Sequence, residues 1–143
     1  MIEGVVLTPL KIIEVKEGDV LHAMKCGDPG FSGFGEAYFS KIEPGSIKAW
    51  KRHQKMVLNL IVPIGEILLV LFDDRNKKKK ITNEFVLSPA NYSRLTVPPM
   101  IWMGFMGLSC ETSILLNIAS VEHDPKEADK KNLKDIDYNW NKI

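Results

Sequence analysis

Four cationic side chains and a tryptophan lie close together in "IKAWKRHQ", residues 47–54. Alternate residues of a strand share a face, so we expect Lys51 and His53 to point one way and Trp50 the other. Lys48 joins Lys51 and His53 only if the strand bulges. A lysine beside a histidine in a dry cavity lowers the pKa of both groups, which gives a neutral base for proton abstraction near neutral pH. The alternative is a strip that is solvated at a sheet edge.

Two asparagines interrupt strands that are otherwise apolar, Asn59 in "MVLNLIV" and Asn117 in "ILLNIAS". A buried amide must find hydrogen-bond partners. Two interpretations are open: the amides bond to the backbone across a sheet, or they face a cavity and orient a ligand.

An aromatic and methionine-rich segment, "TVPPMIWMGFMGLS", covers residues 96–109. Such a segment is typical of a core or a dimer interface. It also offers Trp102 and Phe105 as platforms on which a sugar or a nucleobase could stack. Tyr38, on a strand expected to neighbour the cationic one, is a candidate proton donor.

The sequence lacks the residue patterns of a metal site and of three common catalytic or nucleotide-binding motifs. The three histidines, His22, His53 and His123, do not have the H-x-H spacing of a metal-binding cupin, so we predict no metal site and no cofactor. The motifs G-x-S-x-G, the P-loop and G-x-G-x-x-G are absent from the sequence.

The elements that must position these residues are short apolar runs separated by Gly, Pro and Asn, which is typical of an all-β protein. Several runs are apolar on both faces, which favours sheets packed as a sandwich or barrel. The expected strands cover residues 4–13, 35–42, 47–53, 56–62, 66–72, 84–88, 93–98 and 113–120. "PIG", residues 63–65, predicts a turn in which Gly65 has a positive φ.

Two further segments have distinct patterns. The four lysines Lys77–Lys80 predict a solvated hairpin loop in place of a nucleic-acid site, because no aromatic residue is interleaved with them. In residues 123–133, Asp124 can cap a short helix, Pro125 suits its first position, and Glu127 completes a capping-box spacing. An extended tail follows, whose Tyr138 and Trp140 are expected to pack on the body or on a partner subunit.

The composition favours one domain over residues 1–143. Hydrophobic residues make up 45% and charged residues 26%, and the net charge of +1 gives no overall attraction to nucleic acid or to a membrane surface. The first residues do not resemble a signal peptide, and apolar runs such as "ILLVLF" are too short to cross a bilayer. Two cysteines form no disulfide framework, so a reducing cytoplasmic setting is expected.

Three segments together resemble a known family: "GEAYFSKIEPGSIKAWKRHQ", then "PIGEILLVLFDDR", then "LSPANYSRLTVPPMIWMGFMGLS". Their order and separations over residues 2–120 are similar to those of the dTDP-4-dehydrorhamnose 3,5-epimerases, the sugar-nucleotide isomerases of the cupin superfamily. The resemblance implies a cupin-type jelly-roll β-sandwich, usually a homodimer, with a sugar nucleotide of the dTDP-hexose type in the mouth of the barrel.

Departures from the family pattern concern its chemistry. The family's R-G-L-H histidine, which removes a proton next to a C4 keto group, corresponds to Lys51. Its arginine, which contacts the nucleotide phosphates, corresponds to Lys48, which keeps the charge without the bidentate fork. The later histidine of H-G-F is replaced by Met103, and Lys55 is the possible counterpart of the catalytic lysine.

Two hypotheses of function follow. In the first, the protein is an epimerase-like isomerase for surface-polysaccharide sugars, which uses Lys51, His53 and Tyr38 to move a proton next to a carbonyl. Lys48, Trp50, Asn59, Trp102 and Asn117 then bind the substrate. In the second, it is a cupin without catalysis that binds a sugar nucleotide or a partner enzyme.

Overall fold

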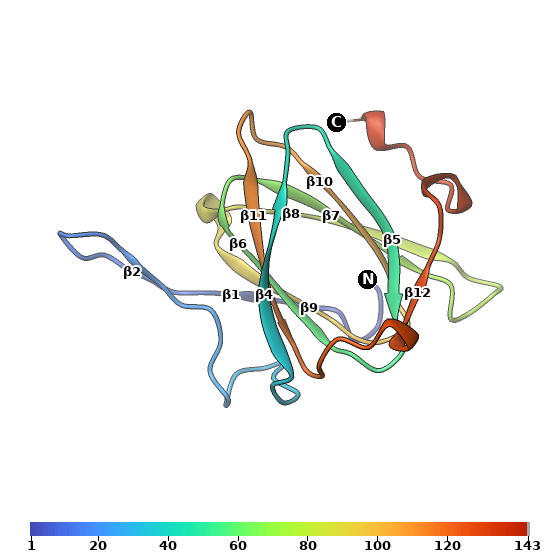
Figure 1. The fold of residues 1–143 in the computed structure, drawn as a ribbon, viewed down its shortest axis with the longest axis horizontal. Coiled ribbons are helices and arrows are strands. Elements are labelled where there is room, and N and C mark those ends of the chain that lie inside the picture. The colour runs from blue at the N-terminus through green and yellow to red at the C-terminus, as the bar shows by residue number, and fades with distance from the viewer. Residues whose placement is uncertain (143) are drawn as a thin grey trace.

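The computed structural model describes residues 1–142, which form two five-stranded antiparallel sheets that face each other (Figure 1). In spatial order the first sheet contains β1 (Val6–Pro9), β9 (Ser93–Val97), β6 (Leu58–Ile64), β11 (Ser113–Ala119) and β4 (Glu36–Ile42). The second sheet contains β12 (Ala128–Lys130), β5 (Ile47–His53), β10 (Trp102–Gly107), β7 (Ile67–Asp73) and β8 (Ile81–Leu87). The all-β, jelly-roll prediction is confirmed.

A separate two-stranded hairpin, β2 (Ile12–Ile13) and β3 (Val20–Leu21), projects away from the sheets (Figure 1, left). Short 3₁₀ turns complete the secondary structure. They are η1 (Pro89–Asn91), η2 (Pro125–Glu127), η3 (Leu133–Asp135) and η4 (Trp140–Lys142). No helix in residues 1–142 has the length and apolar character needed to cross a bilayer.

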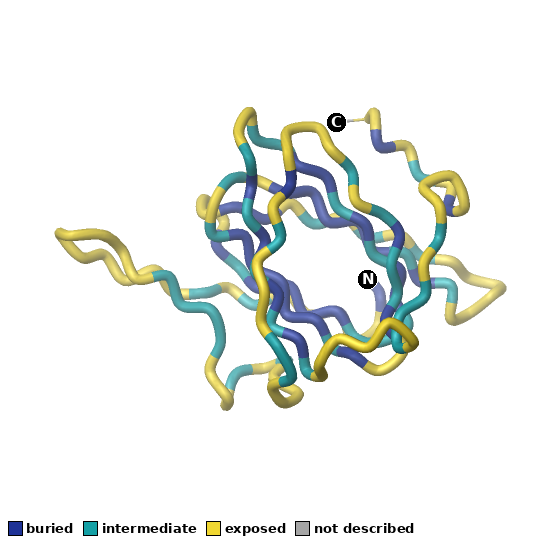
Figure 2. Tube along the Cα trace, in the orientation of Figure 1, coloured by how far each residue is buried: buried dark blue, intermediate teal, exposed yellow. Residues whose placement is uncertain are grey.

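The main core lies between the two sheets, where the apolar runs of β6 and β7 are buried (Figure 2). These two strands are apolar on both faces because their outer faces are also covered. A second apolar cluster on the outer face of the β5–β10–β7 sheet contains Trp50, Leu68, Val70, Trp102, Met106, Ile136 and Trp140. Burying such large side chains stabilises the fold by about 1.5–3 kcal/mol each.

The C-terminal tail supplies part of this second cluster. The ring centroids of Tyr138 and Trp140 are 4.7 Å apart, and that of Trp140 is 5.4 Å from that of Trp50. The tail therefore packs on the body of its own chain, as one of the two sequence-based alternatives predicted.

The helix expected in residues 123–133 is reduced to the single turn η2, because the chain then pairs with β5 as β12. The Asp124 carboxylate accepts a hydrogen bond from the Lys126 backbone N–H at 2.9 Å, so the predicted cap is confirmed. The predicted capping box is wrong, since the Glu127 carboxylate instead bonds to His53 and to the chain between β5 and β6.

Two turn predictions are confirmed. Gly65 lies between β6 and β7 with φ of 79°, and a Cβ there would lie 2.2 Å from Ser113 Oγ. Lys77–Lys80 are exposed in the loop between β7 and β8. β10 was not among the expected strands because it contains two glycines; a Cβ on Gly104 would lie 2.5 Å from the Ala49 Cβ on the adjacent strand.

Candidate active site

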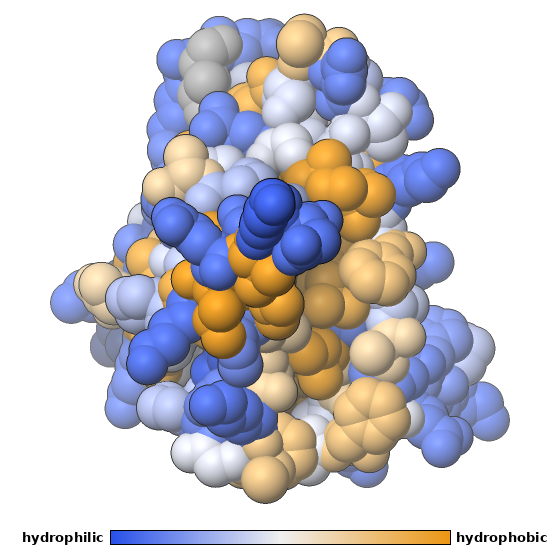
Figure 3. All heavy atoms as spheres, turned by 90° about the vertical axis from the view of Figure 1, so that its left-hand side faces the viewer, coloured by the Kyte–Doolittle hydropathy of each residue, from blue (hydrophilic) through white to orange (hydrophobic). Residues whose placement is uncertain are grey.

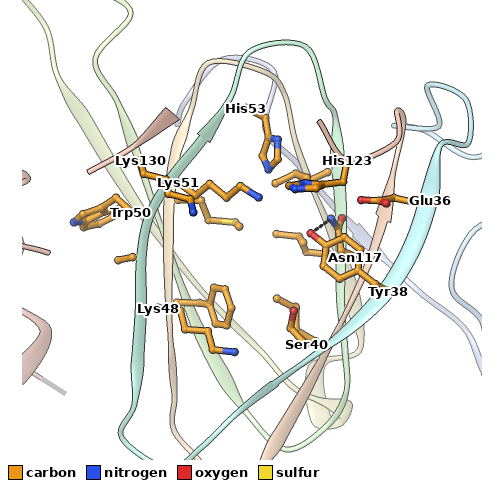
Figure 4. Close-up of a pocket in the computed structure, with 16 residues that line it drawn as sticks. Glu36, Tyr38, Ser40, Lys48, Trp50, Lys51, His53, Asn117, His123 and Lys130 are labelled. Atoms are coloured by element: carbon orange, nitrogen blue, oxygen red, sulfur yellow. Dashed lines mark hydrogen bonds between the residues drawn. The ribbon is translucent and has the colours of Figure 1, made fainter. Parts of the chain in front are cut away.

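A cavity of about 530 Å³ lies between the two sheets. Its apolar wall is formed by Leu58, Leu60, Met103, Phe105 and Leu115. Its polar groups come from β4, β5, β11, β12 and the segment after β11, and include Glu36, Tyr38, Ser40, Lys48, Lys51, His53, Asn117, His123 and Lys130 (Figure 4). Lysine and histidine side chains outnumber carboxylates on this wall, so the cavity suits an anionic ligand.

A bulge in β5 brings three cationic residues to the same cavity. On β10, Met103 lies opposite Lys51 and Phe105 lies opposite Lys48. The two β10 residues are two positions apart, whereas the two β5 residues are three positions apart. The extra residue in β5 breaks the two-residue alternation. Lys48 therefore shares the cavity with Lys51 and His53, as the sequence predicted for a bulged strand. β5 lies between β12 and β10 and is not a sheet edge, and on this face His53 is buried, Lys51 is partly buried and Lys48 is exposed.

His53 is held by a carboxylate. Its Nδ1 lies 2.5 Å from Oε2 of Glu127, and the two side chains are 6% and 9% exposed. Oε1 of Glu127 accepts hydrogen bonds from the backbone N–H groups of Lys55 and Met56, at 2.7 and 2.9 Å. Because Nδ1 is engaged by Glu127, the His53 ring presents Nε2 to the cavity (Figure 4).

The protonation states of this pair follow from burial and hydrogen bonding. Burial lowers the pKa of His53, although the bond to Glu127 opposes that shift. Burial would raise the pKa of Glu127, but His53 and the backbone N–H groups outweigh it and lower that pKa to about 2. The pair is therefore a neutral imidazole oriented by a carboxylate at neutral pH, which is the arrangement of a general base.

Lys51 lies in the same cavity, directly opposite Lys130 of β12 in the strand register. Burial lowers the pKa of Lys51, and the nearby Lys130 lowers it further, while Glu127 and Glu36 act in the opposite direction. The Lys51 amine thus loses its proton more readily than an ordinary lysine.

Tyr38 faces these groups from β4. The Asn117 Nδ2 of β11 donates a hydrogen bond to the Tyr38 hydroxyl oxygen at 3.0 Å (Figure 4, dashed). Asn117 Oδ1 is buried and has no hydrogen-bond partner within residues 1–142. The tyrosine hydroxyl keeps its own hydrogen to donate, and Asn117 keeps an acceptor at the cavity wall.

Lys48 and Phe105 form another part of the wall. Lys48 Nζ donates to the Lys41 carbonyl at 2.6 Å and lies 5.9 Å from the centroid of the Phe105 ring. Phe105 is therefore the aromatic platform of the segment 96–109 that lies in the cavity.

The two tryptophans predicted to bind substrate belong to the outer apolar cluster, although Trp50 is also among the residues that line the cavity. The Trp50 indole points away from the cavity and donates to the Leu133 carbonyl at 3.2 Å (Figure 4). Trp102 is in the same outer cluster and donates to Asp74 at 3.1 Å. The alternation of β5 and β10 puts both tryptophans on the opposite face of the sheet from Lys51.

Asn59 also lies outside the cavity. Its Nδ2 donates to the Gly30 carbonyl at 3.1 Å, and its Oδ1 accepts from the Thr96 hydroxyl at 2.7 Å. Of the two interpretations left open for Asn59, the bond to the Gly30 carbonyl fits the one in which the amide bonds to the backbone. In the β6–β11 register Asn59 pairs with Ile118, whereas Asn117 pairs with Leu60. The two asparagines therefore occupy opposite faces of the first sheet.

Several cavity residues were missed from the sequence. Glu127, Glu36, Lys130 and His123 were assigned no role in the cavity, although Glu127 was singled out as a capping residue. A carboxylate 74 residues from His53 has no spacing signal, since only the β12–β5 pairing brings the two together. Lys55, the possible counterpart of the family lysine, is exposed and does not line the cavity.

Within residues 1–142, no group of three or more His, Cys, Asp and Glu side chains is placed to hold a metal ion.

Comparison with known proteins identifies the family. A crystal structure of a dTDP-sugar isomerase from Desulfovibrio desulfuricans G20 is 34% identical, with a TM-score of 0.93, and the match covers 99% of this chain and 93% of that one. The chain belongs to the dTDP-sugar isomerase family. No protein-family model matches the chain.

Two curated relatives, from different organisms, are similar in sequence to this member of the dTDP-sugar isomerase family. A spore coat polysaccharide biosynthesis protein of Bacillus subtilis is 26% identical over 99% of this chain and 97% of its own length. A probable low-salt glycan biosynthesis epimerase of Haloferax volcanii is 28% identical over 68% of this chain. That second match spans 64% of the archaeal protein, which is less than two thirds of its length.

Solved structures of lower identity share the fold of the family. A sugar 3,4-ketoisomerase from Thermoanaerobacterium thermosaccharolyticum is 19% identical, with a TM-score of 0.77 over 92% of this chain and 90% of its own. A dTDP-4-dehydrorhamnose 3,5-epimerase from Sulfolobus tokodaii is 22% identical, with a TM-score of 0.81 over 95% and 81%.

Proposed function

We propose that this protein is an isomerase of a keto-deoxyhexose nucleotide of the dTDP-sugar type, which moves a proton at a carbon next to the carbonyl. The observation that carries the proposal is the His53–Glu127 pair, which opens into a cavity lined with cations. A proton next to a carbonyl is acidic only when a base is well placed and the developing enolate is stabilised. The cavity offers residues for both tasks.

Each role is assigned from position. His53 takes the proton through Nε2, with Glu127 holding the ring and stabilising the imidazolium that forms. Tyr38 donates its hydroxyl hydrogen to the developing oxyanion, and Asn117 orients that hydroxyl. Lys51 supports the carbonyl oxygen from the β5 side.

The rest of the ligand is assigned to the remaining cavity wall. Lys48 contacts the diphosphate, and Phe105 stacks against a ring of the ligand. Asn117 Oδ1 accepts a hydrogen bond from a sugar hydroxyl, which gives this buried oxygen a partner. Neither a metal nor a cofactor is needed for this proton transfer.

We place the reaction in surface-polysaccharide synthesis in the cytoplasm. Relatives named for spore coat polysaccharide and glycan biosynthesis support the pathway. Cys26 and Cys110 are exposed and free, which suits a reducing compartment. We treat residues 1–143 as one cupin domain.

A homodimer is the assembly we propose. The projecting hairpin β2–β3 carries exposed apolar residues, and apolar side chains gather around it on that side of the molecule (Figure 3). Exposed are Val6, Leu7, Ile12, Ile13, Val15 and Val20. A two-stranded hairpin alone is marginally stable in water, so its apolar side chains favour a second copy of the chain as their cover.

Isotope exchange tests the isomerase proposal. The protein is incubated in D₂O with dTDP-4-keto-6-deoxyglucose, and deuterium next to the carbonyl is followed by NMR. We expect incorporation, and a fall of roughly 10²–10⁴-fold in His53→Asn because the base is lost. His22→Asn, the same change outside the cavity, is the control and keeps the wild-type rate. Absence of exchange with this and related keto-sugar nucleotides contradicts the proposal.

Binding without catalysis is the second candidate function. It is favoured by Met103, which lines the cavity where the resemblance predicts a histidine and which cannot carry a proton. In that case a dTDP-sugar raises the Tm of the protein, the shift survives His53→Asn, and no deuterium is incorporated. A Tm that no sugar nucleotide changes contradicts this candidate as well.

A further inference from the structure

Two lysines on paired strands line the cavity, Lys51 partly buried and Lys130 exposed. Lys51 of β5 is directly opposite Lys130 of β12, and both line the cavity wall. Directly opposed residues of an antiparallel pair have Cβ atoms about 4.5–5.5 Å apart, and like charges at such positions destabilise each other. Such a pair costs stability unless one amine is uncharged.

The neighbouring cations on the other face of the same strands are neutralised. Arg52 pairs with Asp129 at 2.7 Å and with Asp74 at 3.4 Å, and Lys131 Nζ lies 3.6 Å from Asp74. Within residues 1–142, no such ion pair involves Lys51 or Lys130. Arg52 and Lys131 on the outer face thus have ion-pair partners, whereas Lys51 and Lys130 on the cavity face have none among the described residues.

The environment of the Lys51 amine is that of a nucleophile. Apolar side chains, Met103 and Phe105, lie on the same wall, and burial together with Lys130 lowers its pKa. His53 and His123 add two more basic groups to the cavity, against the carboxylates of Glu36 and Glu127. A desolvated lysine beside a second cation is a recurrent arrangement for amines that attack carbonyl groups.

We propose that Lys51 binds the ketone of its ligand covalently, as a Schiff base, and that Lys130, directly opposite on β12, is its positioning residue. This inference rests on the proposed function, because the keto-sugar nucleotide supplies the carbonyl. It adds a covalent step that simple enolisation does not require.

The step balances without an oxidant or reductant. The neutral amine attacks the carbonyl carbon, a C–N bond forms, and the carbonyl oxygen takes up a proton. The carbinolamine then loses water and leaves an iminium ion. Loss of the adjacent C–H proton to His53 gives an enamine, return of a proton restores the iminium ion, and hydrolysis releases the ketone and the free amine.

Reductive trapping tests the proposal. The wild-type protein is incubated with dTDP-4-keto-6-deoxyglucose and sodium cyanoborohydride, which reduces iminium ions in preference to ketones. We expect one adduct per chain, with the mass of the sugar nucleotide less one oxygen atom, and peptide mapping that locates it on Lys51. The adduct is lost in Lys51→Arg and kept in Lys55→Arg, a change at an exposed lysine outside the cavity.

A second measurement does not depend on trapping. A Schiff base exchanges the carbonyl oxygen with water, so the wild type should transfer ¹⁸O from H₂¹⁸O into the ketone faster than the spontaneous reaction. Lys130→Gln should slow adduct formation at pH 7 and move its pH dependence to higher pH. Lys131→Gln, next in sequence but paired with Asp74 on the other face, is the matched control and changes neither.

The outcomes separate this inference from the proposed function. Deuterium exchange without an adduct on Lys51 and without accelerated ¹⁸O exchange overturns the Schiff base and leaves the isomerase proposal standing. An adduct on Lys51 without deuterium exchange supports the Schiff base and contradicts isomerisation. Adducts spread over surface lysines, or neither adduct nor exchange, overturn the covalent proposal.

Discussion

Glu127 controls His53 through a single carboxylate that also holds two backbone N–H groups. In Glu127→Gln the amide can still accept from the backbone but cannot stabilise an imidazolium. We expect kcat for deuterium exchange to fall roughly 10–10²-fold, with little change in KM. Glu122→Gln, an exposed glutamate outside the cavity, is the control and leaves kcat unchanged.

The pH profile distinguishes this positioning role from a merely structural one. Burial lowers the pKa of His53, so the acid limb of kcat/KM for the wild type should lie below the ordinary histidine value of 6.5. The bond to Glu127 partly opposes that shift, so Glu127→Gln should move the limb to still lower pH. An unmoved limb contradicts the role assigned to Glu127.

Acid stability is a separate prediction at the same residue. The pKa of Glu127 is lowered from 4.5 to about 2, so the folded state binds its proton less readily than the unfolded chain. This stabilisation is present above pH 4.5 and is lost as the pH falls toward 2. It amounts to about 3 kcal/mol, and the lowered pKa of His53 acts in the same direction below pH 6.5.

Urea unfolding between pH 7 and pH 2.5 measures this loss of stabilisation by Glu127. Glu127→Gln should be less stable than the wild type at pH 7, with a difference that shrinks as the pH falls. The Glu122→Gln control should follow the wild-type curve. A constant difference at every pH contradicts the shift assigned to Glu127.

At the scale of the element, the bulge in β5 depends on a glycine of the adjacent strand. A Cβ on Gly104 would lie 2.5 Å from the Ala49 Cβ and 3.0 Å from the Trp140 ring. Gly104→Ala should therefore destabilise the fold by about 1–3 kcal/mol, measured by urea unfolding. It should also weaken dTDP binding, because the displaced bulge carries Lys48.

The controls use glycine and alanine changes of the same size. Gly27→Ala, where a Cβ meets nothing within 4 Å, should leave stability nearly unchanged. Adding Ala49→Gly to Gly104→Ala removes one of the two contacts and should restore part of the loss. If Gly104→Ala is as stable as Gly27→Ala, the claim that the bulge in β5 depends on Gly104 is contradicted.

Elements with a clear period could be predicted from the sequence. β4 and β5 begin and end within a residue of their expected bounds, and Pro44 and Gly45 mark the turn between them. β10 and β12 were missed, since one is rich in glycine and the other is a short polar strand held only by pairing with β5.

The candidate site follows the same division. Lys51, His53 and their common face could be predicted from alternation within one strand. Glu127 and Lys130 could not, because only the β12–β5 pairing brings them next to His53 and Lys51, and no local pattern encodes that pairing. Trp102 was offered as a stacking platform because aromatic residues suit both a core and a binding site, and only the face of the sheet, which places Trp102 in the outer cluster, decides between them.

For the whole molecule, the hairpin β2–β3 is the proposed dimer interface, because it projects from the sheets and carries exposed apolar side chains. Ile13 and Val20 face each other across it and are 47% and 50% exposed. If the hairpin packs on a second copy, a charge there must be buried without a partner, which costs several kcal/mol. Val20→Glu should therefore convert the dimer to a monomer, measured by sedimentation velocity across a range of concentrations.

The matched control is Val86→Glu on β8, a strand of the second sheet that does not pair with the hairpin, where the side chain is 39% exposed. It places the same charge on an exposed apolar site and should leave the dimer intact. Because no residue of the hairpin is among those that line the cavity, the Val20→Glu variant should still fold and keep its His53–Glu127 pair. A wild type that sediments as a monomer at every concentration contradicts the homodimer, and a Val20→Glu variant that remains dimeric shows that the hairpin is not its interface.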